Sequence, residues 1–365
     1  MFIMRYMWML MFSVLPLLAL IYIVWHIWTI LPFGVLWKTL IIGIGVACFL
    51  LMFFDLSGRL NTAPLHQAQL LYEIGTSSII IMLYLVMVFL VLDIGRLFHL
   101  VPRSLLYHNW QSALAIFVLI FCIFLYGNIH YKNKVRVALE LKSDKPLSKS
   151  YRLVMASDLH LGFHNTRQEL ARWVDLINAE KPDLILIAGD IIDMSVRPLR
   201  EENMAEEFRR LNAPVYACLG NHEYFSREPE AKRFYKDAGI HLLQDTVAVV
   251  GDLCLIGRDD RTNRERRSVA DIVKDADRSK YMILLDHQPY ELEKTEQAGI
   301  DFQISGHTHR GQVWPISWIT DAVYECSWGS YQRGKTQYYV SSGLGIWGGK
   351  YRIGTQSEYV VATLQ

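Results

Sequence analysis

The fold is decided by an apolar run that reads Arg152-Leu-Val-Met-Ala-Ser157 and passes directly into Asp158-Leu-His160. Continuous apolar runs of four to six residues are typical of strands that are buried on both faces. Alternate residues of an extended chain share a side, so an Asp and a His two positions apart can aim at one point. The stretch therefore predicts a buried strand with two candidate metal ligands at its carboxyl end.

Four more short apolar runs end in polar residues in the same way. In chain order these ends are Gly189-Asp190, Gly220-Asn221-His222, Asp286-His287 and Gly306-His307-Thr308-His309. Segments with helical periodicity lie between them, for example residues 167–178 and 204–211, and this alternation predicts an α/β domain whose helices cover the sheet faces. Less helix lies between the later apolar segments, which predict further strands and a second sheet: 247–256, 337–340 and 359–364.

The five strand ends together predict a metal site. Taken alone, a histidine near a strand end is more often a surface or core residue, and Asp190 or Asn221 could be a turn or helix-cap residue. Strand ends at one edge of an α/β sheet converge in space, however, and that edge is where sites form. Five such ends that all carry carboxylate, amide or imidazole groups favour a shared metal centre over five independent turns.

The motif set resembles the calcineurin-like metallophosphoesterase family. The residues that carry the resemblance, in the order used by that family, are Asp158-Leu-His160, Gly189-Asp190-Ile-Ile-Asp193, Gly220-Asn221-His222-Glu223, His287 and Gly306-His307-Thr308-His309. The resemblance covers residues 151–365 and implies an α/β sandwich of two sheets flanked by helices. Glu223 stands where Asp is commoner in the family, and Arg310 stands where many members have Gly.

The resemblance also implies a role for each ligand candidate. One metal would be held by Asp158, His160 and His309, the other by Asn221, His287 and His307, with Asp190 bridging both. Mixed imidazole, carboxylate and amide donors suit two divalent ions such as Mn²⁺, Fe²⁺ or Zn²⁺ and do not suit Ca²⁺. His222 corresponds to the non-ligating histidine of the family, which stabilises the transition state or protonates the leaving alkoxide.

For other polar residues near the motifs, the sequence allows more than one role. Asp193 either orients a ligand or caps the following helix, and His164 is either a substrate contact or, as the simpler reading, a solvated loop residue. The segment 258–267 holds five arginines and three acids, which fits a solvated surface helix or a lid that grips phosphate. Arg310, next to a ligand, and Arg258 are the candidate substrate-binding residues.

The first third of the chain has a different character. Only eight Asp, Glu, Lys and Arg residues fall within residues 1–130. A helix needs about 20 mostly apolar residues to cross a bilayer, and four such helices are predicted, at 7–30, 36–54, 74–92 and 110–127. Buried core helices are excluded because such sequence leaves no polar face for water. A cleaved signal peptide fits poorly, since no small-residue cleavage site follows and three more spans do. Residues 131–150 then read as a charged connector to the domain at 151–365.

Charge placement bears on location and partners. The net charge of +1 argues against nucleic acid as a partner. Five basic residues against three favour a cytoplasmic catalytic domain in the inner or plasma membrane. The five cysteines show neither C-x-x-C spacing nor an even set in the polar part, which fits free thiols in a reducing compartment.

The predicted function is hydrolysis of a phosphodiester or pyrophosphate bond by a membrane-anchored enzyme. The predicted partners are the lipid bilayer and a lipid or lipid-linked phosphate ester, and UDP-2,3-diacylglucosamine is a specific example because some membrane-associated members of the family resemble pyrophosphatases of that lipid. The alternatives are a phosphomonoesterase or phosphoprotein phosphatase and, outside enzymes, a membrane scaffold with a vestigial domain. Every expected ligand position is filled, which disfavours the scaffold.

Overall fold

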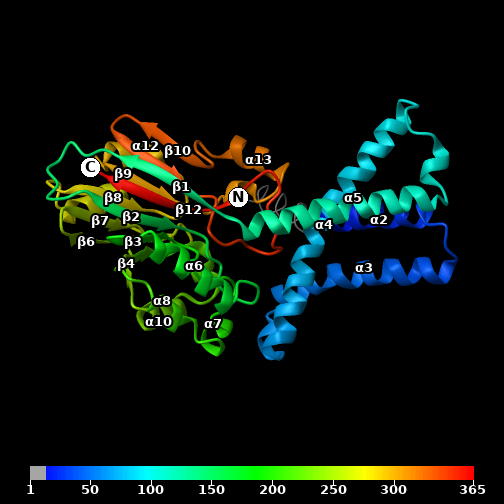
Figure 1. Cartoon of the computed structure of the whole chain (residues 1–365), viewed down its shortest axis with the longest axis horizontal. Helices are drawn as coiled ribbons and strands as arrows, with labels where there is room; N and C mark the ends of the chain where they lie inside the picture. The colour runs from blue at the N-terminus through cyan, green and yellow to red at the C-terminus, as the bar shows by residue number, and fades with distance from the viewer. Residues whose placement is uncertain (1–13) are drawn as a thin grey trace. The chain divides into compact units, whose positions relative to one another are not determined.

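The computed structural model describes residues 14–365, which divide into two units, one ending at Gly127 and one from Asn128 to Gln365. The first unit is helical. Its α-helices are α2 (Leu15–Ile30), α3 (Val35–Leu56), α4 (Leu65–Leu97) and α5 (Trp110–Lys132), and short 3-10 turns lie at η2 (Arg59–Thr62) and η3 (Arg103–Leu106) (Figure 1). The last turns of α5 already belong to the second unit.

Three of these helices, α3, α4 and α5, are long and apolar enough to cross a membrane. The described part of the first predicted helix, α2, has 16 residues, and residues 7–13 of that prediction lie outside the described residues. The expected count of four spanning helices therefore differs from the three found in the described chain. Helix α4 also starts at Leu65 instead of residue 74, because a helix can continue beyond its apolar part and here begins directly after Pro64.

The second unit contains two six-stranded sheets. The first has the order β1-β12-β2-β3-β4-β5, and its strands are β1 (Lys134–Leu141), β12 (Ser357–Leu364), β2 (Tyr151–Ala156), β3 (Leu184–Ala188), β4 (Val215–Cys218) and β5 (Ile240–Leu242). The second has the order β10-β11-β9-β8-β7-β6, and its strands are β10 (Gly329–Arg333), β11 (Thr336–Val340), β9 (Phe302–Ser305), β8 (Tyr281–Leu285), β7 (Leu253–Gly257) and β6 (Thr246–Val250). Within each sheet the central strands are parallel, β2 to β5 in the first and β7, β8, β9 and β11 in the second.

The two sheets pack face to face, and helices cover their outer faces. Leu153 and Leu186 of the first sheet share a core with Ile283 and Phe302 of the second. The outer face of the first sheet packs against helices α6 (Arg167–Ala179), α8 (Met204–Phe208) and α10 (Glu228–Ala238). Shorter helices complete the unit: α7 (Arg197–Glu201), α9 (Asn221–Phe225), α11 (Val269–Ile272), η4 (Val273–Asp275), α12 (Leu292–Gln297), η5 (His309–Gly311) and α13 (Ile316–Val323). The predicted sandwich of two sheets flanked by helices is confirmed.

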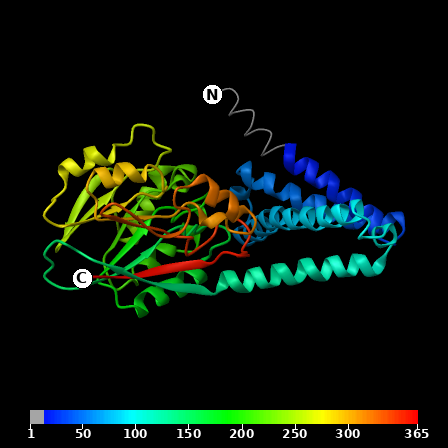
Figure 2. The ribbon, with the colours of Figure 1, turned by 90° about the horizontal axis from the view of Figure 1, so that it is seen from above.

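The segment expected to be a charged connector, 131–150, contains strand β1. This strand pairs in parallel with β12, from Lys134 opposite Ser357 to Leu141 opposite Leu364, and the two run side by side in Figure 2. Its side chains alternate between more and less buried positions, as a strand with one covered face requires. The prediction of a connector was wrong because it rested on the charged residues, which lie on the open face of β1.

Candidate metal centre

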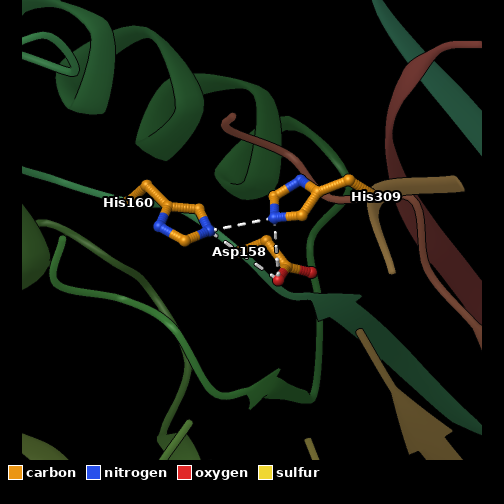
Figure 3. Close-up of side chains that lie close together, drawn as sticks. All are labelled: Asp158, His160 and His309. Atoms are coloured by element: carbon orange, nitrogen blue, oxygen red, sulfur yellow. Dashed lines mark hydrogen bonds and ion pairs between the residues drawn. The ribbon is translucent and has the colours of Figure 1, made fainter. Parts of the chain in front are cut away.

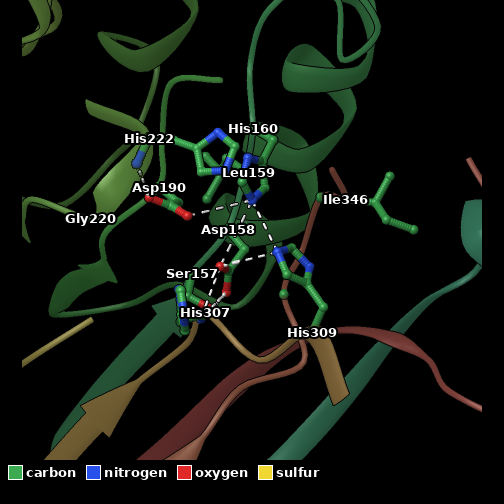
Figure 4. Close-up of polar contacts among 12 residues, drawn as sticks. Ser157, Asp158, Leu159, His160, Asp190, Gly220, His222, His307, His309 and Ile346 are labelled. Atoms are coloured by element: carbon green, nitrogen blue, oxygen red, sulfur yellow. Dashed lines mark hydrogen bonds and ion pairs between the residues drawn. The ribbon is translucent and has the colours of Figure 1, made fainter. Parts of the chain in front are cut away.

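The parallel strands deliver the predicted ligands to one place. Strand β2 ends before Asp158 and His160, β3 before Asp190, and β4 before Asn221, while β8 and β9 of the other sheet end before His287 and His307. Figure 4 shows the side chains of Asp158, His160, Asp190 and His309 turned toward one another. The carboxyl ends of parallel strands meet at one edge of a sheet, and here the edges of both sheets contribute.

One cluster consists of Asp158, His160 and His309 (Figure 3). The Nε2 atoms of the two histidines lie 3.0 Å apart. Asp158 Oδ1 lies 3.4 Å from Nε2 of His309 and 3.9 Å from Nε2 of His160. Three atoms with lone pairs therefore face a common point, as ligands of one cation do.

A second cluster consists of Asp190, His287 and His307. Asp190 Oδ2 lies 3.0 Å from Nε2 of His287, and Asn221 Oδ1 lies 2.8 Å from Nδ1 of His307. The same Asp190 oxygen lies 3.7 Å from Nε2 of His160 in the first cluster. The Asp190 carboxylate thus lies between the two clusters and can be shared by both.

The residues present fit divalent cations. His287 Nδ1 lies 2.7 Å from the carbonyl oxygen of Ala188, which can only accept, so a neutral ring carries its proton there. Its Nε2 lone pair then faces the Asp190 carboxylate, and two acceptors at 3.0 Å need a cation or a proton between them. Burial lowers the pKa of His287, but the Asp190 charge outweighs burial and places the pKa well above its usual value. A metal ion meets the same requirement, and the donor set suits a borderline first-row ion.

Two further histidines are held neutral, with lone pairs free for a metal. Burial, together with the nearby His287, lowers the pKa of His307 to about 4. Burial and the neighbouring ring of His160 lower the pKa of His309 well below its usual value. Metal ligands must be deprotonated, so both rings are in the state that binding requires.

The backbone at these residues is strained. Positive φ angles, which are uncommon for residues other than glycine, occur at Asp158, His160, Asp190, His307 and His309. Such conformations persist where the surrounding structure imposes them, and they concentrate at functional sites. Five of the seven predicted metal ligands have this conformation, so positive φ angles are concentrated in the ligand set.

Two motif glycines leave room for the carboxylates. A Cβ at Gly220 would lie 2.1 Å from Asp190 Oδ1, and a Cβ at Gly306 would lie 2.3 Å from Asp158 Oδ2. Both carboxylates use this room to accept backbone hydrogen bonds, Asp190 from the N–H of His222 at 2.9 Å and Asp158 from the N–H of His307 at 3.0 Å. Each carboxylate is thereby fixed to the neighbouring motif.

Asp193 contacts the histidines of the site. Its Oδ1 lies 2.9 Å from Nδ1 of His222 and 3.5 Å from Nδ1 of His160. Helix α7 begins later, with Val196 at its N-cap. Of the two readings left open by the sequence, the structure therefore favours the one in which Asp193 orients imidazole rings. Burial raises the pKa of Asp193, but the contacts with His160 and His222 outweigh burial and lower it.

His222 and His164 lie beside the clusters in different settings. His222 packs edge-on against His160, with ring centroids 4.5 Å apart. Burial lowers the pKa of His222, but Asp190 and Asp193 outweigh it and raise the pKa to about 9. His164, expected to be a solvated loop residue, is instead buried, and its Nε2 lies 2.6 Å from the carbonyl oxygen of Ile346. The loop that follows the first motif is covered by the chain near Ile346, which the local sequence does not reveal.

Glu223 supports the site through the backbone. Its carboxylate is buried and accepts hydrogen bonds from the N–H groups of Gly220 at 2.7 Å, Ile192 at 2.9 Å and Asp190 at 3.1 Å. One side chain thus ties the Asp190 loop to the Asn221 loop. The resemblance marked this position only as a departure from the commoner Asp, and the extra methylene reaches both loops.

Arg352 is a supporting residue that sequence reasoning missed. Its side chain is fully buried and donates hydrogen bonds to the carbonyl of His309 at 2.7 Å, to Gly345 at 3.3 Å and to the hydroxyl of Ser357 at 3.1 Å. Burial lowers the pKa of Arg352 to about 10, so the group stays charged at neutral pH. No motif surrounds it, and only its burial identifies it.

The two candidate substrate-binding arginines differ. Arg310 is half-buried, and its guanidinium carbon lies 4.0 Å from the centre of the Trp328 ring. Arg258 is buried and forms ion pairs with Asp286 at 3.1 Å and Glu291 at 3.5 Å. The guanidinium of Arg258 is thus used inside the protein, which differs from the expectation of a substrate contact. The segment 258–267 forms turns that contain the buried Asp259 and Asp260, so the expectation of a solvated surface helix is wrong.

Comparison with known proteins gives a consistent set of relatives. The sequence profile of the calcineurin-like phosphoesterases matches residues 151–311. A metallophosphoesterase of Bacillus subtilis is 32% identical over 239 residues, which are 59% of this chain and 79% of that protein. One of Campylobacter jejuni is 32% identical over 60% of each chain, and a transmembrane protein with a metallophosphoesterase domain from Danio rerio is 31% identical over 57% of this chain and 51% of that protein.

These relatives are longer than the matched region. The chain spans about 60% of the length of the curated relatives from Campylobacter and Helicobacter. Among solved structures, a 5'-nucleotidase precursor from Thermus thermophilus matches 59% of this chain and 55% of its own, at 16% identity and a TM-score of 0.37.

Proposed function

We propose that this chain, which belongs to the calcineurin-like metallophosphoesterase family, hydrolyses phosphate esters. The reaction takes place at the candidate metal centre with two divalent cations. The observation that carries the proposal is the position of Asp190 Oδ2, which lies 3.0 Å from His287 and 3.7 Å from His160. A carboxylate between two imidazole clusters is the arrangement that a two-metal phosphoesterase requires.

In this proposal the two clusters divide the ligands. Asp158, His160 and His309 hold one cation, Asn221, His287 and His307 hold the other, and Asp190 serves both. The ions, which we propose to be Mn²⁺, Fe²⁺ or Zn²⁺, supply Lewis-acid chemistry for the attack of water at phosphorus. The protein fixes the ligands through Asp193 and Glu223, whose hydrogen bonds orient imidazoles and backbone.

His222 is the proposed proton donor to the leaving group. Its Nδ1 lies 2.9 Å from Asp193 Oδ1, which fixes the ring and leaves the other ring nitrogen available. A positioned histidine of this kind contributes about 10²–10⁴-fold to a proton-transfer step. Arg310, next to His309, is the proposed contact for a substrate phosphate oxygen, since a guanidinium binds phosphate through two parallel hydrogen bonds.

The proposed substrate is a phosphodiester or pyrophosphate of a membrane lipid or lipid-linked intermediate, such as UDP-2,3-diacylglucosamine. The support is the set of three helices in the same chain that are long and apolar enough to span a bilayer and so to hold the catalytic unit beside lipid headgroups. We further propose that residues 1–130 form the membrane region, that the catalytic domain at 151–365 lies on the cytoplasmic side, and that the protein is a multi-pass protein of the inner or plasma membrane. The excess of basic residues on that side supports this orientation.

The test uses the full-length chain, purified in detergent, with added Mn²⁺. We expect metal-dependent release of nitrophenol from bis-p-nitrophenyl phosphate, faster than from p-nitrophenyl phosphate, and none from an Asp190→Asn variant. Faster cleavage of the monoester would replace the diesterase by a phosphomonoesterase or protein phosphatase. If neither ester is cleaved with Mn²⁺, Fe²⁺ or Zn²⁺, the proposed hydrolase is wrong.

A further inference from the structure

Helix α13 (Ile316–Val323) turns its apolar side chains outward. Trp318 is 64% exposed, and Ile319 and Val323 are each 61% exposed, whereas Ser317 is buried. A helix on a water-soluble domain normally does the reverse and packs its apolar face on the core. The outer face of α13 is therefore suited to an apolar surrounding and not to water.

Ile316, the first residue of α13, is also exposed, as are Trp314, two residues before the helix, and Trp347, in the loop whose Gly349 carbonyl accepts from Gln312 Nε2. Trp314 packs edge-on against Trp318 with ring centroids 5.3 Å apart, and Trp314 N–H donates to the carbonyl of Ile353 at 2.7 Å. We call the set the aromatic patch; its members are Trp314, Ile316, Trp318, Ile319, Val323 and Trp347. Exposed apolar groupings of this kind mark interaction surfaces.

The loop that carries Trp347 also contacts the end of α5. Gln312 Nε2, just before α13, donates to the carbonyl of Gly349 at 3.1 Å, and Asn128 Nδ2 donates to the carbonyl of Lys350 at 3.1 Å. Asn128 lies in the last turns of α5, a helix long and apolar enough to span a bilayer. The loop that carries Trp347 is therefore joined by hydrogen bonds to Gln312, before α13, and to Asn128, where the second unit begins.

The composition of the patch indicates a bilayer surface and not a protein partner. Residues 311–320 contain no Asp, Glu, Lys or Arg, and Asp321, the one charged residue of α13, accepts a hydrogen bond from the Ser327 hydroxyl. Three of the six patch residues are tryptophans, which favour the boundary between lipid headgroups and acyl chains. Short helices with an apolar face and aromatic side chains lie in that boundary layer.

The patch lies next to the metal centre. Helix α13 follows η5 (His309–Gly311), which begins at a proposed ligand. Arg352, in the loop after Trp347, donates to the carbonyl of His309 at 2.7 Å. A surface that enters the headgroup layer at α13 and Trp347 therefore brings the ligand His309 close to that layer.

We propose that the aromatic patch inserts into the headgroup layer of a phospholipid bilayer and presents the metal centre to phosphate esters carried by lipids. The proposal rests on the proposed phosphoesterase function for its substrate class, while the insertion itself stands on the exposed side chains. A second copy of the chain is the other possible occupant of the patch, and the experiment separates the two.

Insertion is tested with the full-length chain, one copy per nanodisc, in a mixture of phosphatidylcholine and phosphatidylglycerol. A nitroxide label is placed at Trp318→Cys or, as a control, at Val249→Cys. Val249 is an exposed apolar residue of the same unit, on strand β6, at 54% against 64% for Trp318. The reactive native thiols are removed by Cys48→Ser and Cys122→Ser, since the other three cysteines are buried.

We expect the label at Trp318→Cys to be accessible to oxygen and protected from a water-soluble nickel chelate, and the label at Val249→Cys to show the opposite. Protection from both reagents in discs with one copy would show that the protein itself covers the residue and would overturn the proposal. Spin–spin broadening from a neighbouring label in samples with two copies would assign the patch to a second copy and overturn it too. Free access of the nickel chelate to Trp318→Cys would overturn it as well.

Presentation of lipid substrates is tested by a double variant, Trp318→Ala with Ile319→Ala, against Val249→Ala. The probes share one leaving group: bis-p-nitrophenyl phosphate in solution and the p-nitrophenyl ester of dioleoyl phosphatidic acid in the disc. We expect the double variant to cleave the soluble ester within about twofold of the unsubstituted chain and to lose at least about tenfold on the lipid ester. Equal effects on both esters would contradict a role in presentation.

The two proposals fail in different ways. If no ester is cleaved by any form, the phosphoesterase function fails, but the spin-label experiment still decides insertion. If the soluble ester is cleaved and the label at Trp318→Cys is in water, the function stands and the insertion is wrong.

Discussion

Tyr131, in the last turn of α5, donates a hydrogen bond of 2.8 Å to Oδ1 of Asn165, close to the metal centre. Both residues are fully buried. Asn165 uses its amide to hold the carbonyls of Leu159 at 2.9 Å and His160 at 3.0 Å. The end of the last apolar helix is therefore joined, through two side chains, to the backbone of a proposed metal ligand.

This connection predicts the effect of Tyr131→Phe. The variant keeps the ring and removes the hydroxyl, so we expect a loss of about 1 kcal/mol in unfolding free energy, the usual contribution of one hydrogen bond. We also expect weaker binding of one cation, because the loop of His160 is less firmly held. Thermal unfolding and metal titration of the detergent-solubilised chain measure both. Tyr331→Phe is the control, since its hydroxyl binds Glu325 at the surface. Equal changes in the two variants would contradict a special role for Tyr131.

His222→Ala separates proton transfer from metal binding. If His222 donates a proton and binds no metal, turnover falls by about 10²–10⁴-fold, while elemental analysis finds the same metal content as in the unsubstituted chain. His287→Ala is the matched comparison and should lose metal. A parallel loss of metal and activity in His222→Ala would show that His222 is a ligand.

Glu223→Ala tests the backbone support of the site. The substitution leaves three buried N–H groups, those of Asp190, Ile192 and Gly220, without their acceptor. Each unsatisfied group costs about 1–3 kcal/mol, so we expect a loss of at least about 3 kcal/mol in unfolding free energy. Glu223→Gln retains an acceptor oxygen and should lose less. A stability within about 0.5 kcal/mol of the unsubstituted chain for Glu223→Ala would contradict the assignment.

Chelation should destabilise the second unit. Ligands that bind only the folded state stabilise it by about 2.7 kcal/mol at one hundred times their dissociation constant. We therefore expect EDTA to lower the thermal unfolding temperature and Mn²⁺ or Zn²⁺ to restore it. The Asp190→Asn variant, which weakens both clusters, should respond less. An unfolding temperature that does not depend on metal would count against the whole metal centre.

His164 should make stability depend on pH. Burial is the main cause that lowers the pKa of His164, to about 4, while an unfolded histidine titrates near 6.5. Because the folded pKa is the lower one, the contribution is complete above about pH 6.5 and is lost as the pH falls from there toward 4. The difference corresponds to roughly 3 kcal/mol.

The measurement compares the unsubstituted chain with His164→Gln, both in EDTA, by unfolding between pH 4 and 8. We expect a flatter pH profile for the variant, because glutamine can still donate to the Ile346 carbonyl but does not titrate in this range. Identical slopes would mean that other histidines cause the pH dependence.

The sequence was sufficient to predict those residues of the site that follow a repeated pattern of apolar run and polar pair. Apolar runs followed by polar pairs predicted the buried strands and the convergence of Asp158, Asp190 and His307, although His307 comes from the second sheet and not from the same sheet edge. Residues that act alone were not predictable in this way. Arg352 and Asn165 lie in no motif, and their roles depend on burial produced by segments distant in the chain.

The predicted boundary of the catalytic domain was wrong where a charged segment forms a strand. Strand β1 was read as a connector because four of the residues in and just before it, from Lys132 to Glu140, carry charges. Those charges lie on the more open face of an edge strand, a usual arrangement that discourages unwanted pairing. The alternation of Val135, Val137 and Leu139 with polar residues was present in the sequence and is the signal that could have identified the strand.

The position of β12 affects how the protein is made. This strand lies between β1 and β2 in the first sheet, although both are synthesised long before it. While the ribosome is still translating the second sheet, α5 can already enter the bilayer, but β1 has no neighbour to pair with. The first sheet closes only after β12 has emerged, so β1 and β2 of the nascent polypeptide keep open edges until that strand arrives.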